Sequence, residues 1–252
     1  MKFEDIKALL DDRYEKYNTN AFIATDPIQL VHEFEKKQDI EIIGLLIATI
    51  AWGNRTSIIK NGSKLIQLMQ GNPHNYVLNY SRDSTEYKFV HRTFNHHDLH
   101  FFLSSLSNIY KKHDSLEELF SEHPEYPGMK GRIIQFRTEF LNTPHEQRSE
   151  KHLSNPLKNS AAKRINMFLR WMVRSDKQGV DFGLWNTIPT SELMIPLDVH
   201  TGNIARKLNL LSRKQNDWKA LEELMIKLRE FDAQDPVKYD FALFGLGAFE
   251  KF

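Results

Sequence analysis

Apolar residues recur at helical spacing through most of the chain, which indicates a protein built from helices. A first amphipathic helix is expected near the start, where apolar residues share one face: Phe3, Ile6, Leu9 and Leu10. A second is expected over residues 27–36. The run 40–52 is apolar almost throughout and exceeds the common length of a strand, so a buried helix is favoured over a buried strand.

The helical spacing continues along the rest of the chain. After a break at Gly53 a helix is expected to about residue 69, and residues 72–123 indicate helices separated by polar turns. Further helices are predicted over residues 133–141, from Lys163, after Asp198 and over residues 218–228. A last helix is predicted to open with Asp235 as its N-cap and Pro236 at its first position.

Strand signals are weak, because no clean alternating apolar run is present. The predicted class is therefore all-α. No linker is long enough to separate independent domains, so residues 1–252 are expected to form a single globular unit.

Composition narrows the possible functions. With 34 Lys and Arg against 33 Asp and Glu, any attraction to nucleic acid must come from local patches of charge. The absence of cysteine excludes disulfides, thiolate zinc sites, a cysteine nucleophile and an iron–sulfur cluster held by cysteines of this chain. No run approaches the ~20 apolar residues that cross a bilayer. We expect a soluble, cytoplasmic and monomeric protein without contact to a membrane.

A cluster of histidines raises the question of a metal site. Four of them crowd one short segment: His91, His96, His97 and His100. Histidines at this spacing can ligate zinc, but no second carboxylate lies nearby in the sequence to complete a site. Surface histidines around an aromatic core segment are the favoured interpretation, and no metal is predicted.

The helix predicted from Lys163 is basic on one side. Lys163, Arg170 and Arg174 fall opposite the apolar face, and a solvated basic face is the simplest interpretation. The approach to this helix adds a second possibility. Asn159 and Ser160 are small or turn-forming, so backbone N–H groups at the helix start could meet a phosphate closely.

Charges near this helix start would support such a contact, since Lys158 and Arg164 flank it.

The second notable helix start is Asp198, which follows Pro196 and suits an N-cap. Capping and catalysis are compatible roles for a carboxylate. A lysine and an aspartate that begin two helices could therefore face each other across a cleft.

The segments LKNSAAKRIN and PLDVHTGNIARKL together resemble two segments of the helix-hairpin-helix base-excision DNA glycosylase superfamily, which includes the endonuclease III and 8-oxoguanine glycosylase branches. In that family a Leu-Pro-Gly-Val-Gly hairpin precedes a helix that, in bifunctional members, begins with the catalytic lysine. A later Val-Asp-Thr-His or Val-Asp-Val-His segment supplies the catalytic aspartate. The resemblance puts Lys163 and Asp198 at these two positions.

Other segments extend the resemblance and also limit it. LLIATIAWGNRTS is similar to the family's Leu-Leu-Ser-(Ala/Thr)-Gln segment, whose loop contacts DNA. The hairpin glycines are replaced by Asn159, Ser160 and Ala161, and the separation from Lys163 to Asp198 is longer than in the familiar branches. Taken whole, the chain is closest to an uncharacterised bacterial family that shares NMFLRWMVR, PLDVH and DPVKYDFALFG.

The resemblance implies two helical lobes with the site in the cleft between them. The first lobe would span about residues 22–176, and the second about residues 1–21 with 177–252. The implied activity is that of a base-excision DNA glycosylase with AP lyase activity, a hydrolase and lyase of DNA repair, acting on a damaged or modified base in double-stranded DNA without a cofactor. Lys163 would be the nucleophile, and Asp198 would stabilise the positive charge that develops on the sugar.

The resemblance and the charge pattern also give candidate contacts. The expected DNA-binding residues are Lys158, Asn159, Ser160, Arg164, Arg170, Asn54, Arg55 and His200. Three aromatic residues are candidates for stacking on an extruded base, although a place in the core is the commoner role for each: Trp185, Trp52 and Phe249.

Two other classes of function remain open. One is a DNA- or RNA-binding module that keeps the two-lobed scaffold without catalysis, which the altered hairpin favours. The other is a small-molecule or nucleoside hydrolase using Asp198 with His200.

Overall fold

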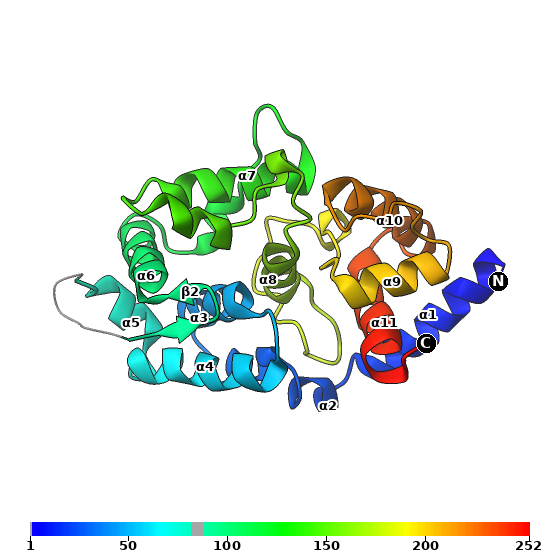
Figure 1. Cartoon of the computed structure of the whole chain (residues 1–252), viewed down its shortest axis with the longest axis horizontal. Helices are drawn as coiled ribbons and strands as arrows, with labels where there is room; N and C mark the ends of the chain where they lie inside the picture. Colours follow the sequence, from blue (N-terminus) through cyan, green and yellow to red (C-terminus); the bar gives the residue numbers. More distant parts are fainter. Residues whose placement is uncertain (1, 82–87) are drawn as a thin grey trace. The chain divides into compact units, whose positions relative to one another are not determined.

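The computed structural model describes residues 2–81 and 88–252 (Figure 1). The described chain is mostly helical, with one short two-stranded sheet, so the predicted all-α class is confirmed. It divides into two compact units. Unit 1 comprises Met1–Thr25 and Asn155–Phe252, and unit 2 comprises Asp26–Ser154.

Unit 2 contains most of the helices predicted in the first half of the chain. Its helical elements are η1 (Pro27–Leu30), α3 (Lys37–Ile50), α4 (Arg55–Leu68), α5 (Pro73–Leu78), α6 (His96–Tyr110), η3 (Leu116–Phe120), α7 (Gly128–Leu141) and η4 (Gln147–His152). The strands β1 (Val90–His91) and β2 (Phe94–Asn95) pair antiparallel, with Val90 opposite Asn95.

Helix α3 is buried from Asp39 to Ile50, which confirms the preference for a buried helix over a strand. Its fully buried acid, Glu41, accepts hydrogen bonds from the Tyr110 hydroxyl (2.7 Å) and the Leu116 amide (3.1 Å). The helix expected over residues 27–36 was wrong beyond its first turn. Only the short η1 forms there, and the chain then continues in turns to the start of α3.

Unit 1 brings together segments from both parts of the sequence. Its elements are α1 (Phe3–Tyr17), α2 (Asn20–Ile23), η5 (Pro156–Lys158), α8 (Lys163–Val173), η6 (Thr190–Glu192), α9 (Val199–Lys207), α10 (Trp218–Phe231), η7 (Pro236–Lys238), α11 (Tyr239–Gly245) and the π-turn η8 (Leu246–Glu250). Figure 1 shows α11 beside both α1 and α9, and it packs against each.

A glycine allows α1 to pack closely on α11. A Cβ added at Gly245 would lie 2.1 Å from a ring carbon of Tyr17, so no larger residue fits without displacement. The Tyr17 hydroxyl donates to Glu250 (2.7 Å), which also accepts from Arg13 and Lys16. Hydrogen bonds therefore link the end of α1 to Glu250, which follows α11.

The unit boundaries differ from those expected for the two lobes. The first lobe was expected to run to about residue 176, whereas unit 2 ends at Ser154 and α8 belongs to unit 1. The physical reason lies in the basic side of α8. Arg170 contacts Asp240 of α11, and Arg174 contacts Tyr14 of α1.

Within residues 2–81 and 88–252, no helix has the length and apolar character required to span a membrane.

Candidate functional site

The turn before α8 contains a residue in the left-handed conformation. Asn159 has φ 61° and ψ 22°, and asparagine tolerates this conformation better than most residues. Its side chain donates to Asp217 Oδ2 (2.8 Å), and its carbonyl accepts from the Trp218 amide (3.0 Å). The hairpin is thereby fixed to the start of α10.

A second left-handed residue, Ala162, immediately precedes Lys163. Its φ of 48° is costly for alanine, by about 1–2 kcal/mol. The surroundings hold it in place, because Asn166 Nδ2 donates to the Ala161 carbonyl (3.0 Å) and the Ala162 amide donates to Ser160 Oγ (3.3 Å). Ala162 provides no side-chain cap to α8, and a helix start of this kind favours an anion.

Lys163 is half-buried at this helix start. Its amine lies 3.8 Å from Met167 Sδ, and no carboxylate of the described residues is within ion-pair distance of it. The neighbouring Arg164 is shielded from solvent, and burial lowers the pKa of its guanidinium to about 10. Arg164 thus stays positively charged at neutral pH.

Asp198 caps α9, as the sequence predicted. Its Oδ1 accepts the Thr201 amide (2.9 Å), and its backbone carbonyl accepts from Asn216 Nδ2 (2.8 Å). Thr201 is fully buried, and its hydroxyl has no hydrogen-bond partner among the residues that the structure describes. The carboxylate is half-buried and fixed by backbone contacts on one side.

A third ionisable residue, Asp240 of α11, is influenced by the charges at both helix starts. Burial raises the pKa of its carboxyl to about 7; Arg170 lowers this pKa, Asp198 raises it, and Lys163 lowers it. Charges act strongly only at short range in a protein. Lys163 and Asp198, predicted from separate motifs, therefore both act electrostatically on one buried carboxyl.

The contacts of Arg170 explain how Asp240 is placed. Its guanidinium hydrogen-bonds Asp240 Oδ2 through Nη1 and Asp181 Oδ1 through Nε (3.2 Å), and it lies 4.4 Å from the Phe241 ring centroid. Only 3% of Arg170 is exposed. The predicted DNA contact of Arg170 was therefore wrong, because its charge is already paired in the interior.

Arg174 extends the same buried network. It contacts Asp181 Oδ2 (3.0 Å), Asp235 Oδ2 (2.9 Å) and the Tyr14 hydroxyl (2.9 Å), and its side chain is fully buried. The interpretation of this side of α8 as a solvated basic face was also wrong. The apolar periodicity is genuine, but the arginines opposite it face carboxylates from later segments instead of water.

The other predicted contacts in unit 1 differ in exposure. Lys158 and His200 are exposed, and Ser160 is half-buried within the hairpin. Trp185 is 2% exposed and packs edge-on against Phe168 at 5.4 Å, so it has the core position expected as the commoner role and is not accessible for stacking on a base. Phe249 is 46% exposed.

The remaining predicted contacts belong to unit 2. Asn54 caps α4 by accepting the Ser57 amide (3.1 Å), and Arg55 lies 3.9 Å from Asp26. The Arg92 guanidinium lies over the Trp52 ring, 4.7 Å from the ring centroid. Arg92 was missed in the sequence, since an isolated arginine after a histidine carries no signal of stacking.

The histidines of the segment have separate contacts. Among the described residues, no group of three or more His, Cys, Asp or Glu is placed to hold an ion. His91 contacts Asn61 (2.9 Å), His100 contacts Tyr80, and the rings of His96 and His97 lie 4.0 Å apart. The interpretation of the cluster as surface histidines was wrong for His91, which is 2% exposed.

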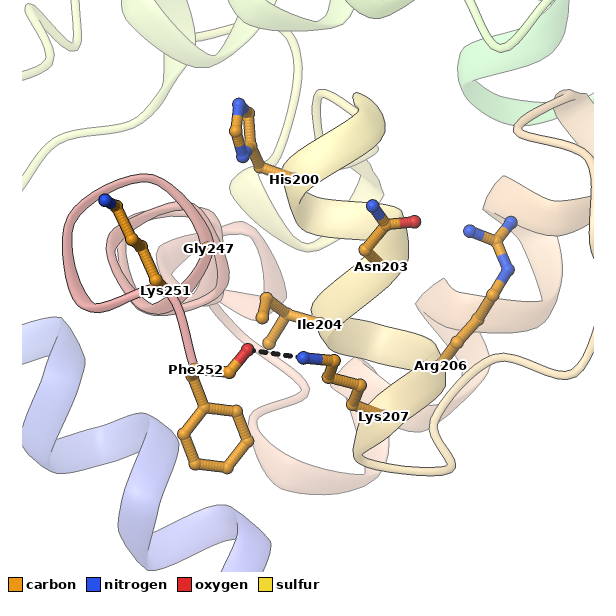
Figure 2. Close-up of a pocket in the computed structure, with 8 residues that line it drawn as sticks. All are labelled: His200, Asn203, Ile204, Arg206, Lys207, Gly247, Lys251 and Phe252. Atoms are coloured by element: carbon orange, nitrogen blue, oxygen red, sulfur yellow. Dashed lines mark hydrogen bonds between the residues drawn. The ribbon is translucent and has the colours of Figure 1, made fainter.

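A pocket of about 380 Å³ lies between α9 and the segment after α11 (Figure 2). Its charged lining side chains are basic, and they include His200, Lys207 and Lys251. Figure 2 shows Lys207 bound to the Phe252 carbonyl, at 2.7 Å. Neither Lys163 nor Asp198 lines this pocket.

Comparison with known proteins assigns the chain to a family. A family model described as a protein of unknown function, DUF2400, matches residues 26–249. The chain belongs to this family. No curated protein and no solved structure gives a significant match.

The DUF2400 match begins at the first residue of unit 2 and includes the candidate site. Lys163, Asp198 and Asp240 all lie within the matched residues. Helix α1, which packs on α11, lies outside them.

Proposed function

We propose that this protein is a DNA glycosylase that removes a damaged or modified base and then cleaves the strand as an AP lyase. The supporting observation is that Lys163 and Asp198 stand at two helix starts of one unit, and that the charges of both influence the buried carboxyl of Asp240. An amine and a carboxylate at two helix starts are the groups that this chemistry requires.

The reaction begins with extrusion of the nucleotide, because a base inside a duplex is out of reach. Extrusion costs about a few kcal/mol, and less for a damaged base. The neutral Lys163 amine forms a bond to the sugar C1′ as the bond from C1′ to the base breaks. The bonding electrons leave with the base, which takes up a proton. Asp198 stabilises the positive charge that develops on the sugar.

Strand cleavage follows from the covalent intermediate. Opening of the sugar ring gives an iminium between Lys163 and C1′, which makes the C2′ proton acidic. Loss of that proton expels the 3′ phosphate, and water then hydrolyses the imine to release the lysine.

The segment before α8 supports contact with the DNA backbone. The start of α8 has no cap from the Ala162 side chain and favours an anion, and Arg164 and the exposed Lys158 supply positive charge nearby. Asn159 maintains the left-handed turn without a glycine. Replacement of the hairpin glycines is thus compatible with the proposed role.

The test is trapping of the covalent intermediate. Borohydride should reduce the imine and leave a protein–DNA adduct with a duplex that contains an abasic site. In Lys163→Ala the adduct should disappear while the circular dichroism spectrum stays that of a folded protein. Lys158→Ala is the matched control, and it should keep the adduct at saturating DNA. An undiminished adduct in Lys163→Ala would exclude this lysine as the nucleophile.

A nucleic-acid-binding role without catalysis is the second candidate. It is favoured by the Trp52 and Arg92 pair of unit 2, since an arginine on an aromatic ring is a common platform for bases. Among the described residues, no carboxylate is within ion-pair distance of Arg92, which leaves its charge available. Salt-dependent binding that weakens in Arg92→Ala, without any adduct or cleaved product on a panel of lesions, would favour this role.

A further inference from the structure

The pocket between α9 and the segment after α11 takes no part in the proposed chemistry, because neither Lys163 nor Asp198 lines it. Its volume of about 380 Å³ is within the range of pockets that hold small organic ligands. The described residues that line it have basic, amide or apolar side chains, and none of them is an acid. The lining therefore favours an anionic ligand.

Helix α9 supplies one wall of this pocket. His200, Asn203 and Lys207 are separated by three and four positions, so they lie along one face of the helix, and all three are exposed. Ile204 is on the same face and is 2% exposed. The wall thus presents polar and basic side chains beside one apolar residue.

The segment after α11 supplies the other wall, and a glycine brings it close to α9. A Cβ added at Gly247 would lie 3.0 Å from the His200 Cβ and 3.2 Å from Ile204 Cγ1. Lys207 joins the two walls, because its amine donates to the Phe252 carbonyl (2.7 Å). Figure 2 shows that basic side chains come from both walls, since the second wall carries Lys251.

The positive charge of the pocket is not neutralised by nearby acids. Within residues 2–81 and 88–252, no carboxylate side chain is at ion-pair distance from His200, Lys207 or Lys251. Glu250 precedes Lys251 in the chain, but basic residues of α1 hold its carboxylate. Arg206 adds charge to the lining, although its guanidinium already donates to two groups of unit 1. The other basic side chains are therefore the ones available to a ligand.

We propose that this pocket binds a phosphate monoester carried on an organic group, as in the 5′-phosphate of a nucleotide. Such a group has a charge of about −1.5 to −2 near neutral pH and three acceptor oxygens, which suits several converging donors. Lys251 and His200 face the phosphate. Ile204 and the Phe252 ring offer apolar surface to the rest of the ligand, and the Asn203 amide can both donate and accept.

Two sources present this chemistry: a free mononucleotide and the 5′-phosphate at the end of a broken strand. A phosphate inside a continuous strand is a diester with a single charge, and the chain extends from it on both sides. The inference does not depend on the glycosylase proposal, because the pocket and the candidate catalytic pair share no residue.

The first measurement is the affinity for adenosine 5′-monophosphate, by isothermal titration calorimetry at low salt, with adenosine as the probe that lacks phosphate. Lys251→Ala should weaken binding of the monophosphate about 10-fold, and Lys251→Arg, which keeps the charge, should retain it. Lys214→Ala is the matched control, because it removes an exposed lysine of the same unit that does not line the pocket. An equal loss in Lys214→Ala would overturn the assignment to this pocket.

The second measurement distinguishes the two sources. The probes are lesion-free duplexes with one strand break that carries either a 5′-phosphate or a 5′-hydroxyl. A preference of about 10-fold for the phosphorylated break, lost in Lys251→Ala, would identify the strand end. Binding of the monophosphate over adenosine without that preference would identify the free nucleotide. A phosphate preference that survives in Lys251→Ala, or no preference in either measurement, would overturn the inference.

Discussion

At the scale of single residues, the candidate site depends on two left-handed backbone conformations that the sequence does not clearly indicate. Asn159 and Ala162 both take left-handed φ values, yet only asparagine is a residue type commonly found there. The strain at Ala162 is held by contacts from Ser160 and Asn166. Strained residues of this kind cluster at functional sites, where the surrounding structure fixes them.

This strain predicts a difference between two neighbouring alanines. Ala162→Gly loses about 0.8 kcal/mol of methyl burial and about 0.5–1 kcal/mol through glycine's flexibility, but it gains about 1–2 kcal/mol by removing the strain. Its free energy of unfolding should stay near that of the wild type. Ala161 is also buried and has no positive φ, so Ala161→Gly should lose about 1.5 kcal/mol. Urea titration measures both, and equal losses would contradict the assigned strain.

Sequence alone reached part of the residue-scale picture. The places of Lys163 and Asp198 at two helix starts were predicted, because helix starts carry local signals. The buried position of Asp240 was not predicted. A single acid among the apolar residues of α11 gives no sign of its contact with Arg170, which lies seventy positions earlier in the chain. Burial of Arg170 was missed for the same reason, since periodicity identifies a polar side without showing what faces it.

At the scale of elements, the contact between α1 and α11 depends on one glycine. A Cβ at Gly245 would meet the ring of Tyr17, and the tyrosine is held in turn by its hydrogen bond to Glu250. Long helices such as α3, α4 and α10 were predicted well because their periodic runs span several turns. The helix expected over residues 27–36 was not, because its run was too short to distinguish a helix from a single turn.

Substitution of this glycine should loosen the contact between the helices. Gly245→Ala should lower the free energy of unfolding by about 1–3 kcal/mol, since it overpacks the interface and displaces Tyr17. Gly247→Ala is the matched control, because its added Cβ would come no closer than 3.0 Å to its neighbours. Chemical denaturation of both variants tests this, and a smaller loss in Gly245→Ala than in Gly247→Ala would contradict the close packing.

At the scale of the whole molecule, unit 2 is one continuous segment, whereas unit 1 is assembled from two. The sequence suggested a division but not its position, because no linker marks it and the contacts of α8 with α1 and α11 decide it. The residues of the candidate site lie in the discontinuous unit. Its integrity therefore depends on α1, although α1 contributes no residue to the proposed chemistry.

The division predicts different behaviour for two fragments. Asp26–Ser154 should fold alone, because it contains its own core, and should show helical circular dichroism with a cooperative thermal transition. Asn155–Phe252 alone should be unstable, because the face of α11 that contacts α1 is exposed. Adding a peptide of residues 1–25 should restore its helicity. A stable Asn155–Phe252 fragment that ignores the peptide would contradict the role of α1.

The separation of α1 from α11 also has a consequence during translation. More than two hundred residues lie between them, so at ~20 residues per second α1 leaves the ribosome roughly 10 s before its partner is made. Unit 2 can fold on the nascent chain in that interval, but Ile6 and Leu10 of α1 remain without the apolar surface that buries them. Helix α1 is thus made long before α11 and is among the last of the described helices to be packed.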